Sequence, residues 1–217
     1  MKVTLAGFNI DTNLVDKLPE GTIATPETIS AAYARISRDP RDVPELRKEA
    51  REQVKKARRS NKAIVFGMSH HSVAEHAYFN FDILQISRLA LEELEARRIG
   101  AAYTEKSQRY ITLKGDFVIP KEFIEDDAKK FKELVEFQNN FYQDNLEKLT
   151  IFQFCNNPEL AEQAEEATAN GIYSNMNRAK NTLEGWAKED ARYALSLATQ
   201  AQLGMSFNAR TLEHAIR

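Results

Sequence analysis

Hydrophobic residues recur along this chain with two periods, and the pattern predicts a mixed fold in which helices dominate. A period of two, typical of half-buried strands, covers Phe79–Ile83 and Leu203–Phe207, and Lys2–Ile10 also has the composition of a strand. A period near 3.6, typical of amphipathic helices, begins after Thr25-Pro26 and recurs at 45–59, 87–98, 126–149, 157–169 and 183–197. We therefore expect the α+β class, with a small, mostly antiparallel sheet flanked by long helices.

Capping residues mark several of the predicted helix ends. Thr25-Pro26-Glu27 combines a hydroxyl at the N-cap, proline at the first helical position and an acid in the first turn. Asn170-Gly171 is typical of a helix C-terminus, and Asn208 would cap a last helix that stops at Arg217. Thr112–Pro120 is expected to be extended, because its pattern lacks a helical period.

The composition narrows the class of protein. This length buries a sizeable core as one domain or as two tightly joined lobes, and we expect a single domain over residues 1–217. Because the last predicted helix has barely started at Arg217 and has no terminator, we expect this domain to be truncated at its C-terminal end. The 30 basic and 32 acidic residues give a net charge of −2, which argues against a nucleic-acid partner. Without a bilayer-length apolar run or a signal-peptide pattern, we expect no membrane partner and a cytoplasmic location. The one cysteine, Cys155, provides neither a disulfide nor a thiolate metal cluster.

The segment Tyr103–Tyr110 concentrates polar side chains between a predicted helix and an extended segment. Arg109 offers a planar fork for a phosphate or carboxylate, and Ser107 and Gln108 can hydrogen-bond a base or a sugar. Glu105 would accept a hydrogen bond from an N–H or hydroxyl group. A solvated turn explains the same composition, since most loops are polar.

Three of the four histidines lie in the segment Ser69–His76, just before the predicted strand at Phe79. His71 and His76 are five positions apart, whereas a helical zinc pair needs a spacing of four. The segment can therefore be a zinc site, a group of buried structural histidines, or a loop that faces a ligand.

Asn208-Ala209-Arg210 follows a predicted strand and opens a helix. The backbone N–H groups of a helix start favour anions, and Asn208 and Arg210 add side-chain donors. By itself this motif is weakly specific, because most helices begin with a capping residue.

Taken in order, these motifs resemble the flavin-dependent thymidylate synthases, also known as the thymidylate synthase complementing proteins. That family carries R-H-R-x-x-S-x-N-E-x-S-x-R-Y, an upstream histidine loop, a late Ala-Arg and an Asn-x-Arg before its last core helix. The matching segments here are Glu75-His76, Phe79-Asn80-Phe81, Glu105–Tyr110, Ala191-Arg192 and Asn208-Ala209-Arg210. The resemblance runs from about Glu27 to Arg217 and is greatest to the first half of members that contain two such domains.

The resemblance implies a specific activity. Family members are α+β homotetramers whose active sites form between subunits, so a homo-oligomer or a second like domain is the expected partner. They bind FAD and dUMP, take reducing equivalents from NADPH, and transfer a methylene group from methylenetetrahydrofolate, a folate, to the pyrimidine. Reduced flavin then supplies a hydride, which gives dTMP, and no enzyme nucleophile is required.

The resemblance also assigns roles to residues by position. Substrate contacts are expected from Glu105, Lys106, Ser107, Gln108, Arg109 and Arg192. The catalytic residues among these would be Glu105, Ser107, Arg109 and Arg192. FAD contacts are expected from Ser72, Arg97, Arg98, Glu105, Asn208, Arg210 and His214.

The chain departs from the family pattern at several positions. The Arg-His-Arg triplet aligns with either Ala96-Arg97-Arg98 or Arg97-Arg98-Ile99, and both alignments lose the histidine. Ala102 and Thr104 stand where the family has serine and asparagine, and Glu93 stands where it has glutamine. A family arginine that activates uracil falls beyond Arg217.

These departures leave alternatives to a flavin-dependent thymidylate synthase. One is a catalytically degenerate subunit that binds FAD or dUMP, or is purely structural, on the same fold. The other is a metal enzyme built on His70, His71 and His76, although we expect no metal site.

Overall fold

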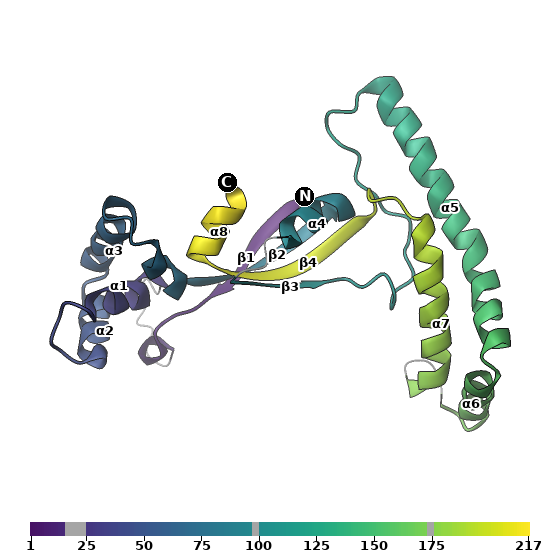
Figure 1. The fold of residues 1–217 in the computed structure, drawn as a ribbon, viewed down its shortest axis with the longest axis horizontal. Helices are drawn as coiled ribbons and strands as arrows, with labels where there is room; N and C mark the ends of the chain where they lie inside the picture. The colour runs from purple at the N-terminus through teal and green to yellow at the C-terminus, as the bar shows by residue number, and fades with distance from the viewer. Residues whose placement is uncertain (16–24, 97–99, 173–175) are drawn as a thin grey trace. The chain divides into compact units, whose positions relative to one another are not determined.

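The computed structural model describes residues 1–15, 25–96, 100–172 and 176–217, and confirms the α+β class (Figure 1). The strands are β1 (Lys2–Phe8), β2 (Tyr78–Ser87), β3 (Ala101–Glu105) and β4 (Gln200–Asn208). The first helices are α1 (Glu27–Arg35), α2 (Val43–Glu52), α3 (Val54–Lys62) and α4 (Arg88–Glu95). The later helices are α5 (Glu125–Asn156), α6 (Pro158–Ala169), α7 (Arg178–Ala191) and α8 (Ala209–Ile216).

The described residues form two compact units. Unit 1 contains Met1–Leu84, Glu92–Thr104 and Gln202–Arg217, and unit 2 contains Gln85–Leu91 and Glu105–Ala201. Among the described residues, no helix has the length and apolar character that a membrane span requires.

The strands form one sheet in the order β1-β2-β4-β3, and β1 pairs with β2 in antiparallel orientation. In β2 the predicted alternation is confirmed, because Phe79 and Phe81 are half-buried, Ile83 is buried, and the residues between them are exposed. In β4, Phe207 is fully buried, and the ring of Tyr103 packs edge-on against it at 5.5 Å between centroids. Strand β3 was not predicted from the sequence.

The helices of unit 1 pack through small side chains. The core of α1–α3 consists of Ala31, Ala32, Leu46, Ala50 and Ala57. The prediction of one helix over 45–59 is wrong, because the backbone of Gln53 leaves the helical region (φ −123°, ψ 53°) and separates α2 from α3. The break allows both helices to contact α1.

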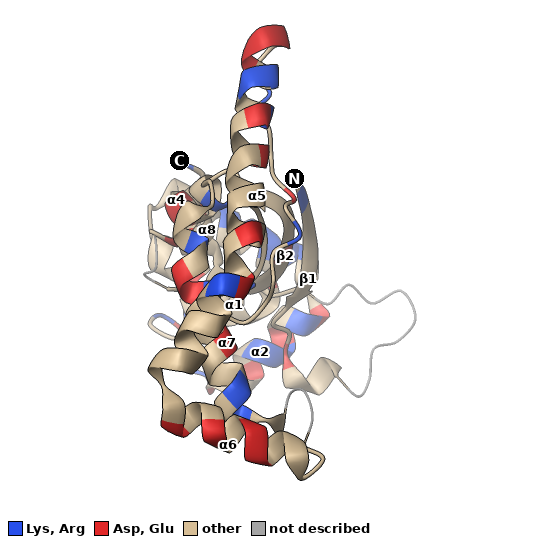
Figure 2. Cartoon of the chain, turned by 90° about the vertical axis from the view of Figure 1, so that its right-hand side faces the viewer, with Lys and Arg blue, Asp and Glu red and all other residues tan. Residues whose placement is uncertain are grey.

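In unit 2, α5 packs against α7, and Val135, Tyr142, Leu183 and Ala187 are buried. The buried side chain of Asn177 caps α7 by accepting a hydrogen bond from the amide of Lys180 at 3.1 Å. This cap explains why α7 begins before the predicted residue 183. Figure 2 shows the acidic residues of the neighbouring α6.

Candidate functional site

Glu105, the last residue of β3, is attached to the start of α4 within unit 2. The carboxylate of Glu105 accepts a hydrogen bond from the guanidinium of Arg88 and forms an ion pair with it. The backbone amide of Arg88 donates to the carbonyl oxygen of Thr199 at 2.9 Å, and the amide of Leu89 donates to Leu197 at 3.0 Å. Arg88, which the sequence interpretation did not include among the site residues, therefore holds Glu105 in place.

Two predicted site residues, Arg109 and Arg192, lie beside the same carboxylate. Glu189 of α7 is 3.9 Å from a guanidinium nitrogen of Arg109 and 3.4 Å from one of Arg192. The Ser107 hydroxyl oxygen accepts a hydrogen bond from the Arg109 amide at 3.2 Å, which shapes the turn. The guanidinium of Arg109 also lies 5.4 Å from the ring centre of Tyr110, within cation–π range.

We call Ser107, Arg109, Glu189 and Arg192 the arginine cluster. One carboxylate between two guanidinium groups leaves an excess of one positive charge. The side chains of Arg109 and Arg192 are 48% and 33% exposed, so an anion from solvent can reach both of them. Lys106, also exposed, and half-buried Gln108 lie in the adjoining turn. The cluster is chemically suited to bind a phosphate or another small anion.

A second candidate site is a cavity of about 550 Å³ in unit 1. Its walls come from the last turn of α1 and the residues after it, and from the histidine segment, whose residues His71–His76 form a 3₁₀ helix. The polar residues that line it are Arg35, Ser37, Arg38, Asp39, His70, Ser72, Glu75 and His76, together with the Tyr33 ring. The volume lies within the range of about 300–1,000 Å³ that is usual for ligand pockets.

The histidine segment is held against α1 by two contacts. The Ser30 hydroxyl donates a hydrogen bond to the Val73 carbonyl oxygen at 2.7 Å, and the rings of Tyr33 and His76 meet edge-on at 4.9 Å. Within the described ranges, no three His, Cys, Asp or Glu side chains gather as a possible metal site. Since His70, Ser72 and His76 line the cavity, the geometry favours the ligand-facing interpretation of this segment.

The start of α8 is joined to the same segment. Arg210 forms an ion pair with Glu75, and the Ala209 amide donates to the Ala77 carbonyl oxygen at 2.8 Å. Asn208 caps α8 as predicted, because its side-chain oxygen accepts a hydrogen bond from the Thr211 amide at 2.8 Å. Gly100 has a positive φ of 72°, and a Cβ there would lie 2.8 Å from the Asn208 side-chain nitrogen.

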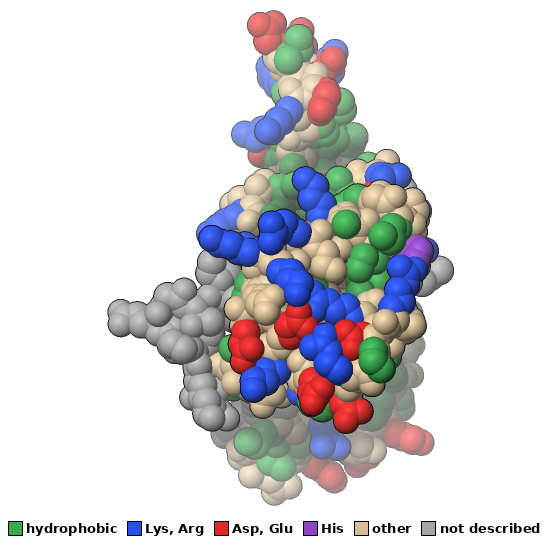
Figure 3. Space-filling model, turned by 90° about the vertical axis from the view of Figure 1, so that its left-hand side faces the viewer, with side chains coloured by type: hydrophobic (Ala, Val, Ile, Leu, Met, Phe, Trp, Pro, Cys, Tyr) green, Lys and Arg blue, Asp and Glu red, His purple; other side chains and the backbone are tan. Residues whose placement is uncertain are grey.

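Positive charge gathers at the end of α1 beside the cavity. Glu49 accepts ion pairs from Arg35 at 3.1 Å, Arg41 at 2.9 Å and Lys56 at 2.7 Å. The hydrogen bonds from Lys56 and Arg41 lower the pKa of Glu49 to about 2, so this carboxylate stays ionised. The Arg38 guanidinium forms no ion pair in the described part of the chain. Figure 3 shows Lys and Arg side chains gathered on this face of unit 1, among acidic residues.

The predicted site residues thus fall into two groups. Arg109 and Arg192 meet at Glu189 in unit 2, which also holds Ser107 and the Arg88–Glu105 pair, whereas Ser72 and Arg210 adjoin the cavity of unit 1. Asn208 is buried as a helix cap, and His214 is exposed on α8. Arg97 and Arg98 lie outside the described residues.

Sequence reasoning missed several residues of these sites. They are Arg35, Ser37 and Arg38 in the cavity, and Arg88 and Glu189 in unit 2. Arg35 and Arg38 resemble the basic residues that ordinarily complement a helix C-terminus, and Glu189 resembles any solvated acid. Only the fold reveals their neighbours.

Comparison with known proteins identifies the family. Residues 17–217 match the family described as thymidylate synthase complementing protein, Thy1. The chain belongs to this family. It is 29% identical to a flavin-dependent thymidylate synthase of Pyrococcus abyssi over 150 residues, which cover 69% of this chain and 49% of that protein. The corresponding enzyme of Clostridium tetani is 28% identical over 195 residues, 88% of this chain and 69% of that protein.

The chain spans about half the length of several Thy1 relatives, including the Pyrococcus abyssi protein. A solved structure has the same fold: the UMP/dUMP methylase PolB from Streptomyces cacaoi bound with 5-Br dUMP. It superposes with a TM-score of 0.53 at 16% identity and covers 98% of this chain and 75% of that protein. At this identity the likeness shows a shared fold.

Proposed function

We propose that this chain acts as a flavin-dependent thymidylate synthase, an FAD-dependent methyltransferase that converts dUMP to dTMP. Methylenetetrahydrofolate would be the carbon donor, and NADPH would supply reducing equivalents through FAD. Membership of the Thy1 family supports the proposal. The observation that carries it is that the Glu189 carboxylate of α7 lies beside both Arg192 and Arg109, and that Arg109 shares its turn with Ser107.

In this proposal the arginine cluster binds the nucleotide. Arg109 and Arg192 supply charge-assisted donors to the dUMP phosphate, and both are exposed enough to exchange Glu189 for a ligand oxygen. Ser107, Gln108 and Lys106 add donors along the same turn for the sugar or base. Glu105, fixed by Arg88, would accept a hydrogen bond from the nucleotide or from the flavin.

The cavity in unit 1 has residues that fit part of a flavin dinucleotide. Its volume suits a ligand of that class, and Arg35, Arg38 and the Ser72 hydroxyl can donate hydrogen bonds to pyrophosphate oxygens. Arg210, at the start of α8, would add a further donor, and Asn208 would position that helix. His214, Arg97 and Arg98 complete the proposed FAD set. When bound, FAD would supply the two-electron redox chemistry of the reaction.

The protein's own contribution would be binding, orientation and electrostatics. Arg109 and Arg192 hold the nucleotide, and the Arg88–Glu105 pair restricts the turn that carries Ser107 and Gln108. Ser107 and Gln108 would then be preorganised hydrogen-bond donors. Such donors stabilise a transition state most strongly where negative charge develops, here on the pyrimidine oxygens. No nucleophilic side chain is needed.

Two further features complete the proposal. We expect a homo-oligomer, in the form of a tetramer, or pairing with a second like domain. We also expect a cytoplasmic location, with no nucleic-acid or membrane partner.

A tritium-release assay tests this function. dUMP labelled at the carbon that receives the methylene group is incubated with the chain, FAD, NADPH and methylenetetrahydrofolate. A thymidylate synthase releases tritium to water because that hydrogen is displaced. No release, despite measurable binding of both FAD and dUMP, would reject catalysis by this chain.

The second candidate is a non-catalytic FAD- or dUMP-binding subunit. It is favoured by Ala96 and Ala102, apolar residues that align with an arginine and a serine of the family pattern. Loss of one donor to a developing charge commonly lowers the rate by roughly 100- to 1,000-fold, whereas binding survives the loss of one contact among several. Binding of both ligands without tritium release identifies this alternative.

A further inference from the structure

Helix α5 carries a second apolar face, opposite to the one that packs in unit 2. Its buried residues Val135, Asn139 and Tyr142 follow one side of the helix. On the other side, five large apolar side chains are 52–66% exposed: Leu134, Phe137, Phe141, Ile151 and Phe152. Scattered exposed apolar residues are normal, but several large apolar side chains along one side of a single helix are typical of an interaction surface.

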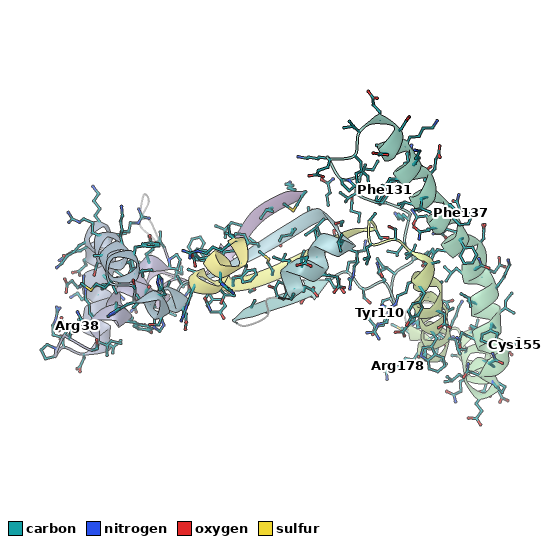
Figure 4. The ribbon with its side chains drawn as sticks, turned by 45° about the horizontal axis from the view of Figure 1, so that its top comes forward. Arg38, Tyr110, Phe131, Phe137, Cys155 and Arg178 are labelled. Carbon is teal, nitrogen blue, oxygen red and sulfur yellow. The ribbon has the colours of Figure 1, made fainter. Side chains whose placement is uncertain are left out.

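The row follows a heptad pattern. Steps of three and four alternate without interruption through the positions Leu134, Phe137, Phe141, Asp144, Lys148, Ile151 and Cys155. This spacing keeps all of them on one side of the helix over a length of about 32 Å. We call these seven residues the outer stripe of α5. Figure 4 labels Phe137 and Cys155 on the side of α5 turned away from α7.

The outer stripe can pair with a reversed copy of itself that is centred on position 146. In such a pair, residues at equal distances before and after position 146 face each other. Asp144 and Lys148 lie two residues before and after that position, Phe141 and Ile151 five, and Phe137 and Cys155 nine. Two antiparallel copies therefore place each Asp144 opposite a Lys148, with apolar residues facing apolar residues on both sides. A parallel pair would instead place identical charges opposite each other.

We propose that the outer stripe of α5 binds the outer stripe of a second copy of this chain, in antiparallel orientation with position 146 at the twofold axis. Asp144 and Lys148 form no ion pair in the described part of the chain, so both are available to a partner. Each of these charges interrupts the apolar row, and the opposite charge of the second copy neutralises it. A partner of another kind would have no reason to match both the order of the charges and the spacing of the apolar residues.

Disulfide trapping tests the orientation and the register together. The proposal places Phe137 of one copy opposite Cys155 of the other, and Cys155 is exposed. The variant Phe137→Cys, incubated with a mild oxidant, should form a covalent dimer on a non-reducing gel that dithiothreitol reverses. The wild-type chain should not, because its two Cys155 residues would be about 27 Å apart along the helices.

Two controls make the result specific. Glu136→Cys places a thiol in the same turn but off the outer stripe, and Phe137→Cys with Cys155→Ser removes the partner thiol. Both variants should give at least about tenfold less covalent dimer than Phe137→Cys alone, because neither places two thiols opposite each other. Equal cross-linking of Phe137→Cys and Glu136→Cys, or none in either, would overturn the proposal.

The central charges give a second test in the Phe137→Cys background. Lys148→Asp or Asp144→Lys alone places like charges opposite each other, and should slow cross-linking at least about tenfold. The double exchange, Asp144→Lys with Lys148→Asp, should restore the rate. Failure of the double exchange to restore it would reject the antiparallel pairing. Neither test bears on the proposed activity, because the outer stripe contains no residue of the arginine cluster or the cavity.

Discussion

Arg109 and Arg192 come from distant parts of the sequence, and the Glu189 carboxylate lies beside both guanidinium groups. The two guanidinium groups carry like charges that repel each other, and the shared acid offsets this repulsion. An incoming phosphate would take over that role and would gain directional hydrogen bonds from both side chains. The affinity of this site for a phosphate should therefore depend on each of these charged side chains.

Arg109→Ala should weaken dUMP binding by roughly ten- to a hundredfold, because a charge-assisted hydrogen bond is worth roughly 1.5–3 kcal/mol. Titration calorimetry measures the change. Arg178→Ala is the matched control, because Arg178 is an exposed arginine at the opposite end of α7 (Figure 4). Equal affinity in wild type and Arg109→Ala would exclude the arginine cluster as the nucleotide site.

Glu49→Gln should change how stability depends on pH. The lowered pKa of Glu49, about 2 in the folded state, means that its ionised form stabilises the protein above about pH 4.5. That contribution is lost as pH falls from about 4.5 towards 2. The variant should melt about 2–4 °C lower at pH 7 and should differ little from wild type near pH 2. Thermal unfolding at both pH values measures this, and an equal gap at both would contradict the assignment.

At the scale of elements, the sequence predicts well wherever local chemistry decides the structure. The cap at Asn208, the alternation in β2 and the helix end at Asn170-Gly171 are all confirmed, because each depends on neighbouring residues. The Gln53 break and strand β3 were missed. Gln53 is a good helix former, and β3 acquires its partner β4 from far along the chain.

Asn177→Ala should weaken the attachment of α6 to α7, because the Asn177 side chain bonds to both helices. Its side-chain oxygen caps α7, while its nitrogen donates to the Ala164 carbonyl oxygen of α6 at 2.8 Å in a buried setting. Loss of a cap and a buried hydrogen bond should lower the free energy of unfolding by about 2–3 kcal/mol. Urea unfolding measures the loss.

The control for that variant is Asn140→Ala, which removes an exposed asparagine from α5 and should change stability by less than about 0.5 kcal/mol. Similar losses in both variants would show that Asn177 has no special role in joining α6 to α7.

At the scale of the whole molecule, each unit contributes one candidate ligand site. Unit 1 is assembled from three separate segments, and its cavity combines residues near position 35 with residues near position 72. The sequence pointed to Arg109 through its chemistry as well as through family resemblance, and to Ser72 and Arg192 through the resemblance. They could not predict Arg35, Arg38 or Glu189, whose neighbours depend on tertiary packing.

The central claim is that this Thy1 family member binds both a flavin and a uridine nucleotide, as the proposed function requires. The most direct test records the visible absorption of FAD during titration with the purified chain and then with dUMP. We predict a bound flavin whose band shifts when dUMP is added, and a weaker shift in Arg109→Ala. No bound flavin at saturating FAD, or a flavin band that dUMP leaves unchanged, would contradict the account.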